Sequence, residues 1–375
     1  MQAMHLGVPK EIKVHEYRVG MTPASVREVI HHGHQVTVQT MAGHAIGLED
    51  DDYRAAGANI VDTAAEVFAT ADMIVKVKEP QPVEIAMLRK DQILFTYLHL
   101  APDPEQTKGL IDSGCIAIAY ETVTDARGTL PLLAPMSEVA GRMSIQAGAH
   151  CLEMEPGGRG VLLGGVPGVP SGKVVVIGGG VVGTNAARMA VGLECDVVII
   201  DRSLKRLAEL DEMFRGRINT IYSTAGNIEE QVVDADLVVG AVLVPGAAAP
   251  HLVTRDMIKK MRRGAVIVDV AIDQGGCFAT SKATTHSEPT YVVDDVVHYC
   301  VANMPGGVAR TSTFALNNAT LPFTLALADK GYRDALLSDP HLCAGLNVHK
   351  GQLTYEAVAI DQNLNYVPAK DVLAA

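Results

Sequence analysis

The chain has 375 residues, with 31 lysines and arginines against 43 aspartates and glutamates, and a formal net charge of −12. At roughly 150 residues per domain, this length predicts about two domains. A hydrophobic fraction of 48% is typical of a globular protein and not of a disordered one. The excess of acidic residues argues against a nucleic-acid partner, because neutralising phosphates requires clustered lysine and arginine side chains.

Cysteine spacing and hydropathy exclude several further classes of protein. The six cysteines lie far apart and mostly among apolar or small neighbours, so we expect buried free thiols and no disulfide framework or cysteine-based zinc site. The N-terminal segment MQAMHLGVPKEIK lacks the basic start and long apolar run of a secretory signal. No segment approaches the roughly 20 uninterrupted apolar residues of a membrane helix. We therefore expect a cytoplasmic protein with no membrane contact.

The first third of the chain alternates short apolar strands with helical patterns. Strands are expected at residues 5–10, 35–40, 59–62, 72–78, 92–100 and 115–122, and helices at 23–32, 49–57, 63–71 and 104–113. Thr22 suits the N-cap of the first helix, and Pro23 suits its first helical position. Repeated strand–helix units predict an α/β fold with a mostly parallel sheet.

A second series of strands and helices begins near residue 136. It opens with a long helix at 136–154 and a glycine-rich connector at 156–172. Further strands are expected at residues 173–177, 196–201, 217–223, 236–242, 265–271 and 290–295. Two helices, at 316–330 and 333–338, leave this series. The low aromatic content and the valine- and isoleucine-rich strands are typical of parallel sheets buried on both faces.

The strongest motif is a dinucleotide fingerprint formed by Gly178, Gly180 and Gly183 between an apolar strand and a helical run. One glycine makes the tight turn, one lets the backbone approach a pyrophosphate, and one permits close packing of helix on strand. Asp201 ends the next strand, where a carboxylate accepts hydrogen bonds from the adenosine ribose. Because that carboxylate repels a 2′-phosphate, the motif predicts NAD, although Arg202 beside it leaves NADP open.

Four polar residues follow the ends of apolar strands, which is where open α/β sheets bind ligands. They are Arg18, Lys78, His99 and Asp273. Each has a plainer interpretation as well. Arg18 could be a surface arginine paired with Glu16, and Lys78 a solvated strand end. His99 could be a satisfied core histidine, and Asp273 the cap of a turn before two glycines.

A cluster of imidazoles at residues 31–34, with the sequence HHGH, invites a metal interpretation. The cluster lies at the end of a helix and before a turn, where imidazoles suit the negative end of the helix dipole. No second group of ligands accompanies it in the sequence. We therefore predict no metal site.

Beyond these motifs, the chain resembles the bacterial NAD-dependent L-alanine dehydrogenase family over nearly its whole length. The resemblance implies two Rossmann-like, doubly wound parallel-sheet domains: a discontinuous substrate and catalytic domain at 1–132 and 307–375, and an NAD-binding domain at 133–306. The matching segments are GVPKEIKVHEYRVGMTP (7–23), KVKEP (76–80), TYLHLA (96–101), AYETV (119–123), LPLLAPMSEVAGR (130–142), VIGGGVVG (176–183), GAVLVPGAAAP (240–250), DVAIDQGG (269–276) and VANMPG (301–306).

The resemblance also implies roles for individual positions. Arg18 and Lys78 would hold the substrate carboxylate and carbonyl oxygen, His99 would be the general acid/base, and Asp273 the second catalytic acid. Two further residues, Met136 and Asn303, would shape the substrate pocket. The expected NAD contacts are Ser137, Gly178, Gly180, Val181, Val182, Gly183, Asp201, Arg206, Ser223, Val242, Leu243, Val270, Asp273, Val301, Asn303 and Met304.

The implied activity is reversible oxidative deamination of L-alanine to pyruvate and ammonium with hydride transfer to NAD, in a homohexamer. Two other interpretations stay open. One is the nucleotide-binding subunit of a proton-translocating transhydrogenase, against which the residues Lys78 and His99 argue. The other is a catalytically silent NAD-binding protein of the same fold, which would have no reason to carry Arg18, Lys78, His99 and Asp273 together.

Overall fold

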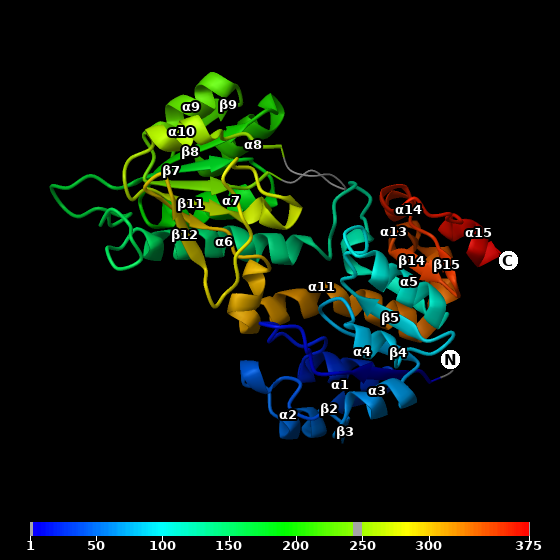
Figure 1. Cartoon of the computed structure of the whole chain (residues 1–375). Coiled ribbons are helices and arrows are strands. Elements are labelled where there is room, and N and C mark those ends of the chain that lie inside the picture. Colours follow the sequence, from blue (N-terminus) through cyan, green and yellow to red (C-terminus); the bar gives the residue numbers. More distant parts are fainter. Residues whose placement is uncertain (1–2, 243–249, 375) are drawn as a thin grey trace. The chain divides into compact units, whose positions relative to one another are not determined.

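The computed structural model describes residues 3–242 and 250–374 and forms two compact units. One unit comprises Met1–Pro135 and Val308–Ala375, and the other comprises Met136–Gly307. The first unit is therefore built from both ends of the sequence. Figure 1 shows its blue and cyan N-terminal elements together with orange and red C-terminal ones, whereas the second unit runs from green to yellow.

The sheet of the first unit is mostly parallel, with strand order β15-β14-β6-β5-β4-β1-β2-β3. The six strands β1 to β6 are parallel, whereas β14 and β15 are antiparallel at one edge. The strands are β1 (His5–Val8), β2 (Gln35–Gln39), β3 (Asn59–Val61), β4 (Met73–Val75), β5 (Ile93–Thr96), β6 (Ile116–Ala119), β14 (Leu346–His349) and β15 (Gln352–Leu353). Sequence order reverses between β1 and β4, so loops after these two strands meet at the switch point of the sheet.

Side-chain caps start several helices of the first unit. Thr22, Thr63 and Asp103 each accept a hydrogen bond from a backbone N–H in the first turn of α1, α3 and α5, as N-cap residues do. The helices of this unit are α1 (Pro23–His31), α2 (Asp50–Ala55), α3 (Ala64–Thr70), α4 (Pro82–Ile85), α5 (Pro104–Ser113), α11 (Ala309–Lys330), α12 (Tyr332–Ser338), α13 (Pro340–Cys343), α14 (Glu356–Gln362) and α15 (Ala369–Ala374), with short 3₁₀ turns η1 (His44–Ile46) and η2 (Tyr120–Thr122).

The second unit repeats the same arrangement, with strand order β12-β13-β11-β10-β7-β8-β9. Its elements are α6 (Ala134–Cys151), which begins two residues before the unit, then β7 (Lys173–Ile177), α7 (Val181–Gly192), β8 (Asp196–Asp201), α8 (Leu204–Phe214), β9 (Asn219–Tyr222), α9 (Ala225–Val233), β10 (Leu237–Gly240), α10 (Arg255–Lys260), β11 (Val266–Asp269), η3 (Val270–Gln274), β12 (Thr290–Val293), β13 (Val296–Tyr299) and η4 (Met304–Val308). The prediction of two doubly wound α/β sheets is confirmed.

Both faces of the second sheet are buried, which explains its apolar strand sequences. Along β7, Val174 and Val176 lie in one hydrophobic core, while Val175 and Ile177 lie in another. Since successive side chains of a strand point to opposite faces, both sets must be apolar when helices cover both faces. The six cysteines are buried and free, as predicted.

The structure corrects the sequence prediction at the edges of the sheets. A single strand was expected at 290–295, but the chain forms an antiparallel hairpin of β12 and β13 whose turn residues Asp294 and Asp295 both have positive φ. Aspartate tolerates that left-handed conformation, which tight hairpin turns require. In the C-terminal segment only helices were expected, whereas β14 and β15 form a second antiparallel hairpin. Their sequences, LNVH and QL, are too short to show a clear strand pattern.

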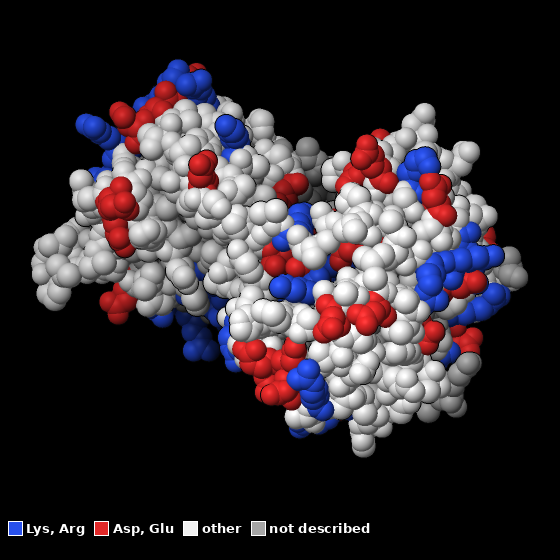
Figure 2. Space-filling view, turned by 60° about the horizontal axis from the view of Figure 1, so that its bottom comes forward, with Lys and Arg blue, Asp and Glu red and all other residues white. Residues whose placement is uncertain are grey.

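No helix within the described residues is long and apolar enough to cross a membrane. Among the described residues on the face drawn in Figure 2, blue basic and red acidic side chains are interspersed over a largely uncharged surface.

Two histidines of the HHGH segment contact one aspartate of α11. His34 Nε2 lies 2.9 Å from Asp329 Oδ1, and His32 Nδ1 lies 3.0 Å from Asp329 Oδ2. The backbone N–H of Met4 donates to His34 Nδ1, so Nε2 carries the proton and donates to the carboxylate. Burial would raise the pKa of Asp329, but the hydrogen bonds from His34 and His32 outweigh it and lower this pKa. These contacts tie the start of β2 to the end of α11.

Asp329→Asn is expected to lower the melting temperature at neutral pH by about 2 °C, which corresponds to hydrogen bonds to the carboxylate worth about 1 kcal/mol. A lowered folded-state pKa contributes stability that is present above the unfolded value of about 3.9 and is lost as pH falls through the folded pKa. In thermal melts, the difference in melting temperature between variant and wild type should therefore be smaller at about pH 3.5, below the unfolded pKa, than at about pH 5.5. An equal difference at both pH values would contradict this account.

Candidate active site

In the first unit, three sequence-predicted residues lie on loops that follow neighbouring strands at the switch point. Arg18 follows β1, Lys78 follows β4, and His99 follows β5. The carboxyl ends of parallel strands lie at one edge of a sheet, and ligands of doubly wound folds bind there. The ring of Tyr97 stacks on that of His99, with 5.8 Å between centroids, and the charge of Arg18 acts on the Tyr97 hydroxyl. The unit therefore brings the three residues into one region.

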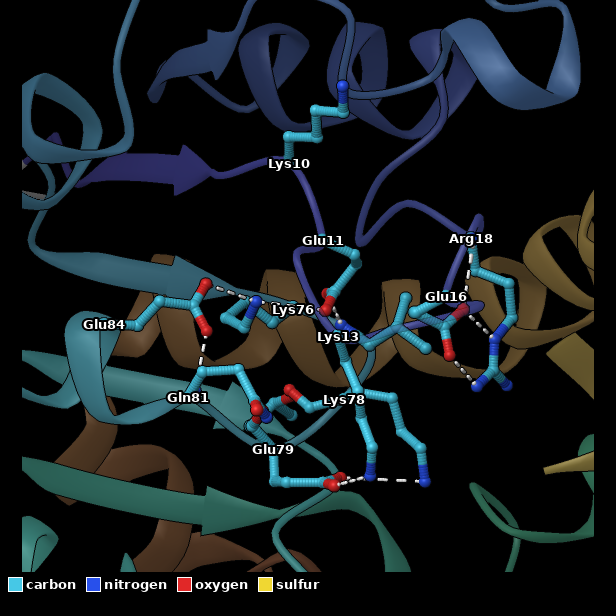
Figure 3. A network of polar contacts seen from close by, with 12 residues as sticks. Lys10, Glu11, Lys13, Glu16, Arg18, Lys76, Lys78, Glu79, Gln81 and Glu84 are labelled. Carbon is cyan, nitrogen blue, oxygen red and sulfur yellow. Dashed lines mark hydrogen bonds and ion pairs between the residues drawn. The ribbon is translucent and has the colours of Figure 1, made fainter. Parts of the chain in front are cut away.

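Arg18 is buried and held by Glu16. Its Nε donates to Glu16 Oε1 at 2.7 Å, and its Nη2 donates to Glu16 Oε2 at 2.6 Å, as Figure 3 shows. The interpretation as a surface arginine is wrong, because only 2% of the residue is exposed. Burial would lower the pKa of Arg18, but the hydrogen bonds and charge of Glu16 raise it. The guanidinium is thus a fixed cation whose plane Glu16 sets.

Lys78 lies three residues beyond Val75, the last residue of β4, so the strand ends three residues earlier than predicted. The ladder between the strands nevertheless continues, because Lys76 N donates to Phe95 O and Tyr97 N donates to Val77 O, both at 3.2 Å. Lys78 Nζ lies 3.6 Å from Glu79 Oε2, and Lys13 contacts the other oxygen of Glu79 (Figure 3).

These lysines stabilise the charge of Glu79. Burial would raise the pKa of Glu79, but the positive charges of Lys78 and Lys13 outweigh it and lower this pKa. Two lysines therefore share one carboxylate next to the buried Arg18–Glu16 pair, and the side chain of Lys78 is only 13% exposed. A partly buried ammonium interacts more strongly with an anionic ligand than a fully solvated one.

His99 is exposed and has a left-handed backbone conformation, with φ of 49°. Such a conformation is uncommon for a residue with a side chain and must be held by its surroundings. Glu121 supplies the constraint, because its carboxylate accepts the backbone N–H groups of Leu98 at 3.1 Å and of His99 at 2.6 Å. The interpretation as a core histidine is wrong, because His99 lies exposed at the surface of this unit.

In the second unit, the glycine fingerprint has the geometry that its sequence predicts. Gly178 ends the strand segment with φ of 102°, Gly180 is the N-cap of α7, and a Cβ at Gly183 would lie 1.8 Å from Gly178 O. The turn therefore requires glycine at its first and last fingerprint positions. The backbone N–H groups at the start of α7 form the kind of end that binds phosphate.

Asp201 and Arg206 hold this turn. Asp201 Oδ2 accepts the backbone N–H of Gly179 at 2.7 Å, and Arg206 donates from Nε to Gly179 O at 2.7 Å and from Nη2 to Thr184 Oγ1 at 2.8 Å. Asp201 is the last residue of β8, as expected. Arg206 therefore contacts the glycine turn itself, in addition to Glu209 at 2.8 Å.

Asp273 lies in η3, directly after β11, and is exposed. The preceding Asp269 is completely buried and accepts hydrogen bonds from Ala271 N, Cys277 N and the hydroxyl of Ser281. Burial raises the pKa of Asp269 above its usual range. Asp269 thus fixes both ends of the loop that carries Asp273.

The remaining predicted cofactor residues follow the carboxyl ends of other strands in the second unit or begin α6. Ser223 follows β9, Val242 follows β10, Val270 follows β11, and Val301, Asn303 and Met304 follow β13, while Val181 and Val182 begin α7, and Met136 and Ser137 lie in the first turn of α6. Leu243 lies outside the described residues. Within residues 3–242 and 250–374 no group of three or more histidine, cysteine, aspartate or glutamate side chains could hold a metal ion.

Sequence inspection missed three carboxylates that position these loops, Glu11, Glu121 and Asp269, and considered Glu16 only as a surface partner of Arg18. Glu11 and Glu121 bond to groups 65 and 22 positions away, so no local spacing reveals them. One signal was present, since Lys76 interrupts the otherwise apolar strand MIVKV. A charge in a buried strand requires a partner.

Comparisons with known proteins agree along the whole chain. The Alanine dehydrogenase/PNT N-terminal domain model matches residues 7–140, and the Alanine dehydrogenase/PNT C-terminal domain model matches residues 144–356. An alanine dehydrogenase from Halomonas elongata is 61% identical over 370 residues, covering 99% of this chain and 100% of that protein. One from Methanococcus maripaludis is 55% identical over 371 residues, with coverage of 99% and 100%.

Among solved structures, an L-alanine dehydrogenase superposes with a TM-score of 0.93 at 53% identity, covering 96% of this chain and 99% of that one. A transhydrogenase from Sinorhizobium meliloti has a TM-score of 0.81 at 23% identity, with coverage of 93% and 100%. The second likeness shows a shared fold alone, whereas the first extends to sequence.

Proposed function

Because this chain belongs to the alanine dehydrogenase family, we propose that it catalyses the reversible NAD-dependent oxidative deamination of L-alanine to pyruvate and ammonium. The observation that carries the proposal is the 61% identity to a curated alanine dehydrogenase along the full chain. The balanced reaction is L-alanine + NAD⁺ + H₂O ⇌ pyruvate + NH₄⁺ + NADH + H⁺. The first unit is the substrate and catalytic domain in this proposal, and the second unit is the NAD-binding domain.

The substrate carboxylate is the ligand that the cations of the first unit suit. Arg18 is a permanent cation held in a fixed plane by Glu16, and Lys78 is a second, partly buried cation on the next loop of the switch point. Alanine and pyruvate share the carboxylate, so Arg18 binds both. Lys78 stabilises negative charge that develops on the carbonyl oxygen of pyruvate, an effect that is largest where water is excluded.

Proton transfers are assigned to His99 and Asp273. Addition of water to the imine of the oxidised substrate gives a carbinolamine, and its collapse to pyruvate releases ammonium. These steps move protons on and off oxygen and nitrogen, and imidazole has an intrinsic pKa near neutrality that suits both directions. Asp273 orients the attacking water or accepts its proton.

The residues of the second unit fit NAD. A Cβ at Gly183 would collide with Gly178 O, so this glycine permits the close packing of α7 on β7, whereas a Cβ at Gly180, the N-cap of α7, would meet no atom within 4 Å and leaves the helix end open to a pyrophosphate. Asp201 lies at the end of β8, where its carboxylate reaches the ribose hydroxyls. When bound, NAD supplies the hydride acceptor for the reaction. Met136 and Asn303, also in this unit, are substrate-binding residues in this proposal.

The test is steady-state formation of NADH from L-alanine by the purified full chain, with pyruvate amination as the reverse assay. Turnover of alanine without any partner protein is expected, and glycine or 2-aminobutyrate should be weaker substrates, because one methylene changes discrimination by only about 1–3 kcal/mol. Hydride exchange between NADH and an NADP analogue without alanine turnover would favour a transhydrogenase instead. The proposed homohexamer predicts a solution mass of six chains, and a cytoplasmic location stays a prediction.

Asp201→Ser is expected to weaken the preference for NAD over NADP by about tenfold or more, since a hydrogen bond to a charged group contributes about 1.5–3 kcal/mol. The variant loses the carboxylate that binds the ribose hydroxyls and repels a 2′-phosphate. The measurement is the ratio of kcat/KM for the two cofactors. Asp196→Ser, at the opposite end of β8, is the matched control and should change that ratio far less. A wild type that prefers NADP would overturn the role of Asp201.

A further inference from the structure

A second lysine, Lys76, lies two residues before Lys78 and has no exposed surface. Its Nζ donates to Glu11 Oε2 at 3.0 Å and to Glu84 Oε1 at 2.7 Å, as Figure 3 shows. Lys76 directly follows β4, and the chain bends at Val77 and Lys78 just beyond it. Because Lys76 is fully buried, a substrate cannot touch it. Its ammonium can act only through its two carboxylates.

Glu11 links this ammonium to the loop that carries Arg18. One carboxylate oxygen of Glu11 accepts Lys76, and the other accepts the backbone N–H of Val77 at 2.7 Å. Both ties join the loop between β1 and α1 to the segment that ends in Lys78. Glu84 instead belongs to α4. Its second oxygen accepts the backbone N–H of Gln81 at 2.8 Å and caps that helix.

The same two segments approach each other at further points. A Cβ at Gly20 would lie 2.3 Å from the backbone oxygen of Val75, so the loop after Arg18 lies against the end of β4 as only glycine permits. Nearer the surface, Lys13 contacts Glu79, and Figure 3 shows both reaching toward the ammonium of Lys78. The Lys76 contacts are the innermost of these ties.

The contact between Glu11 and Lys76 depends on the positive charge of the lysine. Burial raises the pKa of Glu11, and the charge of Lys76 opposes this effect. Burial would likewise lower the pKa of Lys76, but Glu11 and Glu84 outweigh it. Without the ammonium, two buried carboxylates would face each other, and the loop would have to move to hydrate Glu11.

We propose that Lys76 is a positioning residue: through Glu11 it holds the loop that carries Arg18 against the segment that carries Lys78, so that the two cations meet a carboxylate substrate at a fixed separation. This inference rests on the proposed substrate roles of Arg18 and Lys78. Buried ion pairs contribute little net stability compared with apolar replacements. Positioning therefore explains a fully buried lysine at this place better than stability does.

The test compares two matched variants that each remove one carboxylate charge from the same ammonium. Glu11→Gln loosens the tie to the Arg18 loop, whereas Glu84→Gln loosens only the tie to α4. We expect Glu11→Gln to raise KM for both L-alanine and pyruvate by about tenfold or more, because small misplacements of binding groups cost up to about a hundredfold. Glu84→Gln should leave both KM values within about twofold of wild type, a change below the tenfold expected when binding groups are misplaced.

Lys76→Met, which keeps an unbranched side chain as far as Cε without the ammonium, should raise both KM values at least as much as Glu11→Gln. The Kd for NADH, measured by fluorescence titration, should stay unchanged in all variants, because the glycine turn belongs to the other compact unit. If Lys76→Met does not fold, the pair of glutamine variants decides alone. Equal effects of Glu11→Gln and Glu84→Gln on KM, or no effect of either, would overturn the inference.

Two further variants separate failure of this inference from failure of the proposed function. Arg18→Met and Lys78→Met each remove a proposed substrate contact directly. If neither raises KM, the substrate roles themselves are wrong. If both raise KM while Glu11→Gln does not, only the positioning role of Lys76 fails.

Discussion

Replacing His99 with alanine should lower kcat for L-alanine oxidation by about 10²–10⁴-fold, the range that a positioned general acid/base contributes. The loss should appear in both directions, because the carbinolamine is formed and broken through the same proton transfers. The KM values of the His99→Ala variant should change little, since Arg18 and Lys78 hold the substrate in the proposed site. Steady-state rates of alanine oxidation and pyruvate amination measure both quantities.

His44→Ala is a suitable control, because that histidine also lies in the first unit and contacts a glutamate, Glu49, at the surface. It should retain wild-type kcat. A second variant, Glu121→Gln, should lower kcat although it retains His99. The substitution weakens the acceptor that holds the left-handed backbone at His99. Near wild-type turnover by both His99→Ala and Asp273→Ala would show that the catalytic assignment is wrong.

Gly183→Val should abolish binding of the dinucleotide and unfold or distort the second unit. Its Cβ would lie 1.8 Å from the backbone oxygen of Gly178, a position that no side-chain movement can relieve. Either the turn opens or α7 moves away from β7, and both displace the helix end that would meet the pyrophosphate. NADH fluorescence titration and a thermal melt should show loss of binding together with a lower melting temperature.

Gly192→Ala provides the matched control on the same helix. A Cβ there meets no atom within 4 Å, and Gly192 is the last residue of α7. Alanine favours a helix over glycine by about 1 kcal/mol in its interior and by less at its end. This variant should therefore bind NADH normally and melt at or slightly above the wild-type temperature. Normal NADH binding by Gly183→Val would contradict the assigned turn.

Local sequence pattern was sufficient for the parts of this protein that depend on one segment. The fingerprint glycines follow a strand and precede a helix, so their backbone geometry follows from neighbours within a few residues. Likewise, Thr22 and Pro23 mark the start of α1 because a cap needs only the first helical turn. The antiparallel edge strands were the exception, since β14 pairs with β6 across more than two hundred residues of sequence.

The site residues were found as single positions, but their environment was not. Sequence offered both a surface and a ligand-binding interpretation of Arg18, and only the fold shows that Glu16 holds it in a buried site. Nor does spacing show why His99 can adopt a left-handed conformation, because Glu121 comes from η2, the turn that follows the neighbouring strand β6. The roles of these residues in catalysis stay predictions that the variants above test.

By itself, the sequence determined the α/β class, the mostly parallel sheets buried on both faces and the glycine turn, because these depend on hydrophobic period and on backbone freedom within short segments. Only the tertiary structure decided where the charges go. Lys76, Glu11 and Glu84 lie up to 73 positions apart and meet in a buried place, where each charge requires a partner. Burial and pairing are properties of the assembled sheet and its loops, and they bring scattered charged residues together in the region where we propose that a small carboxylate binds.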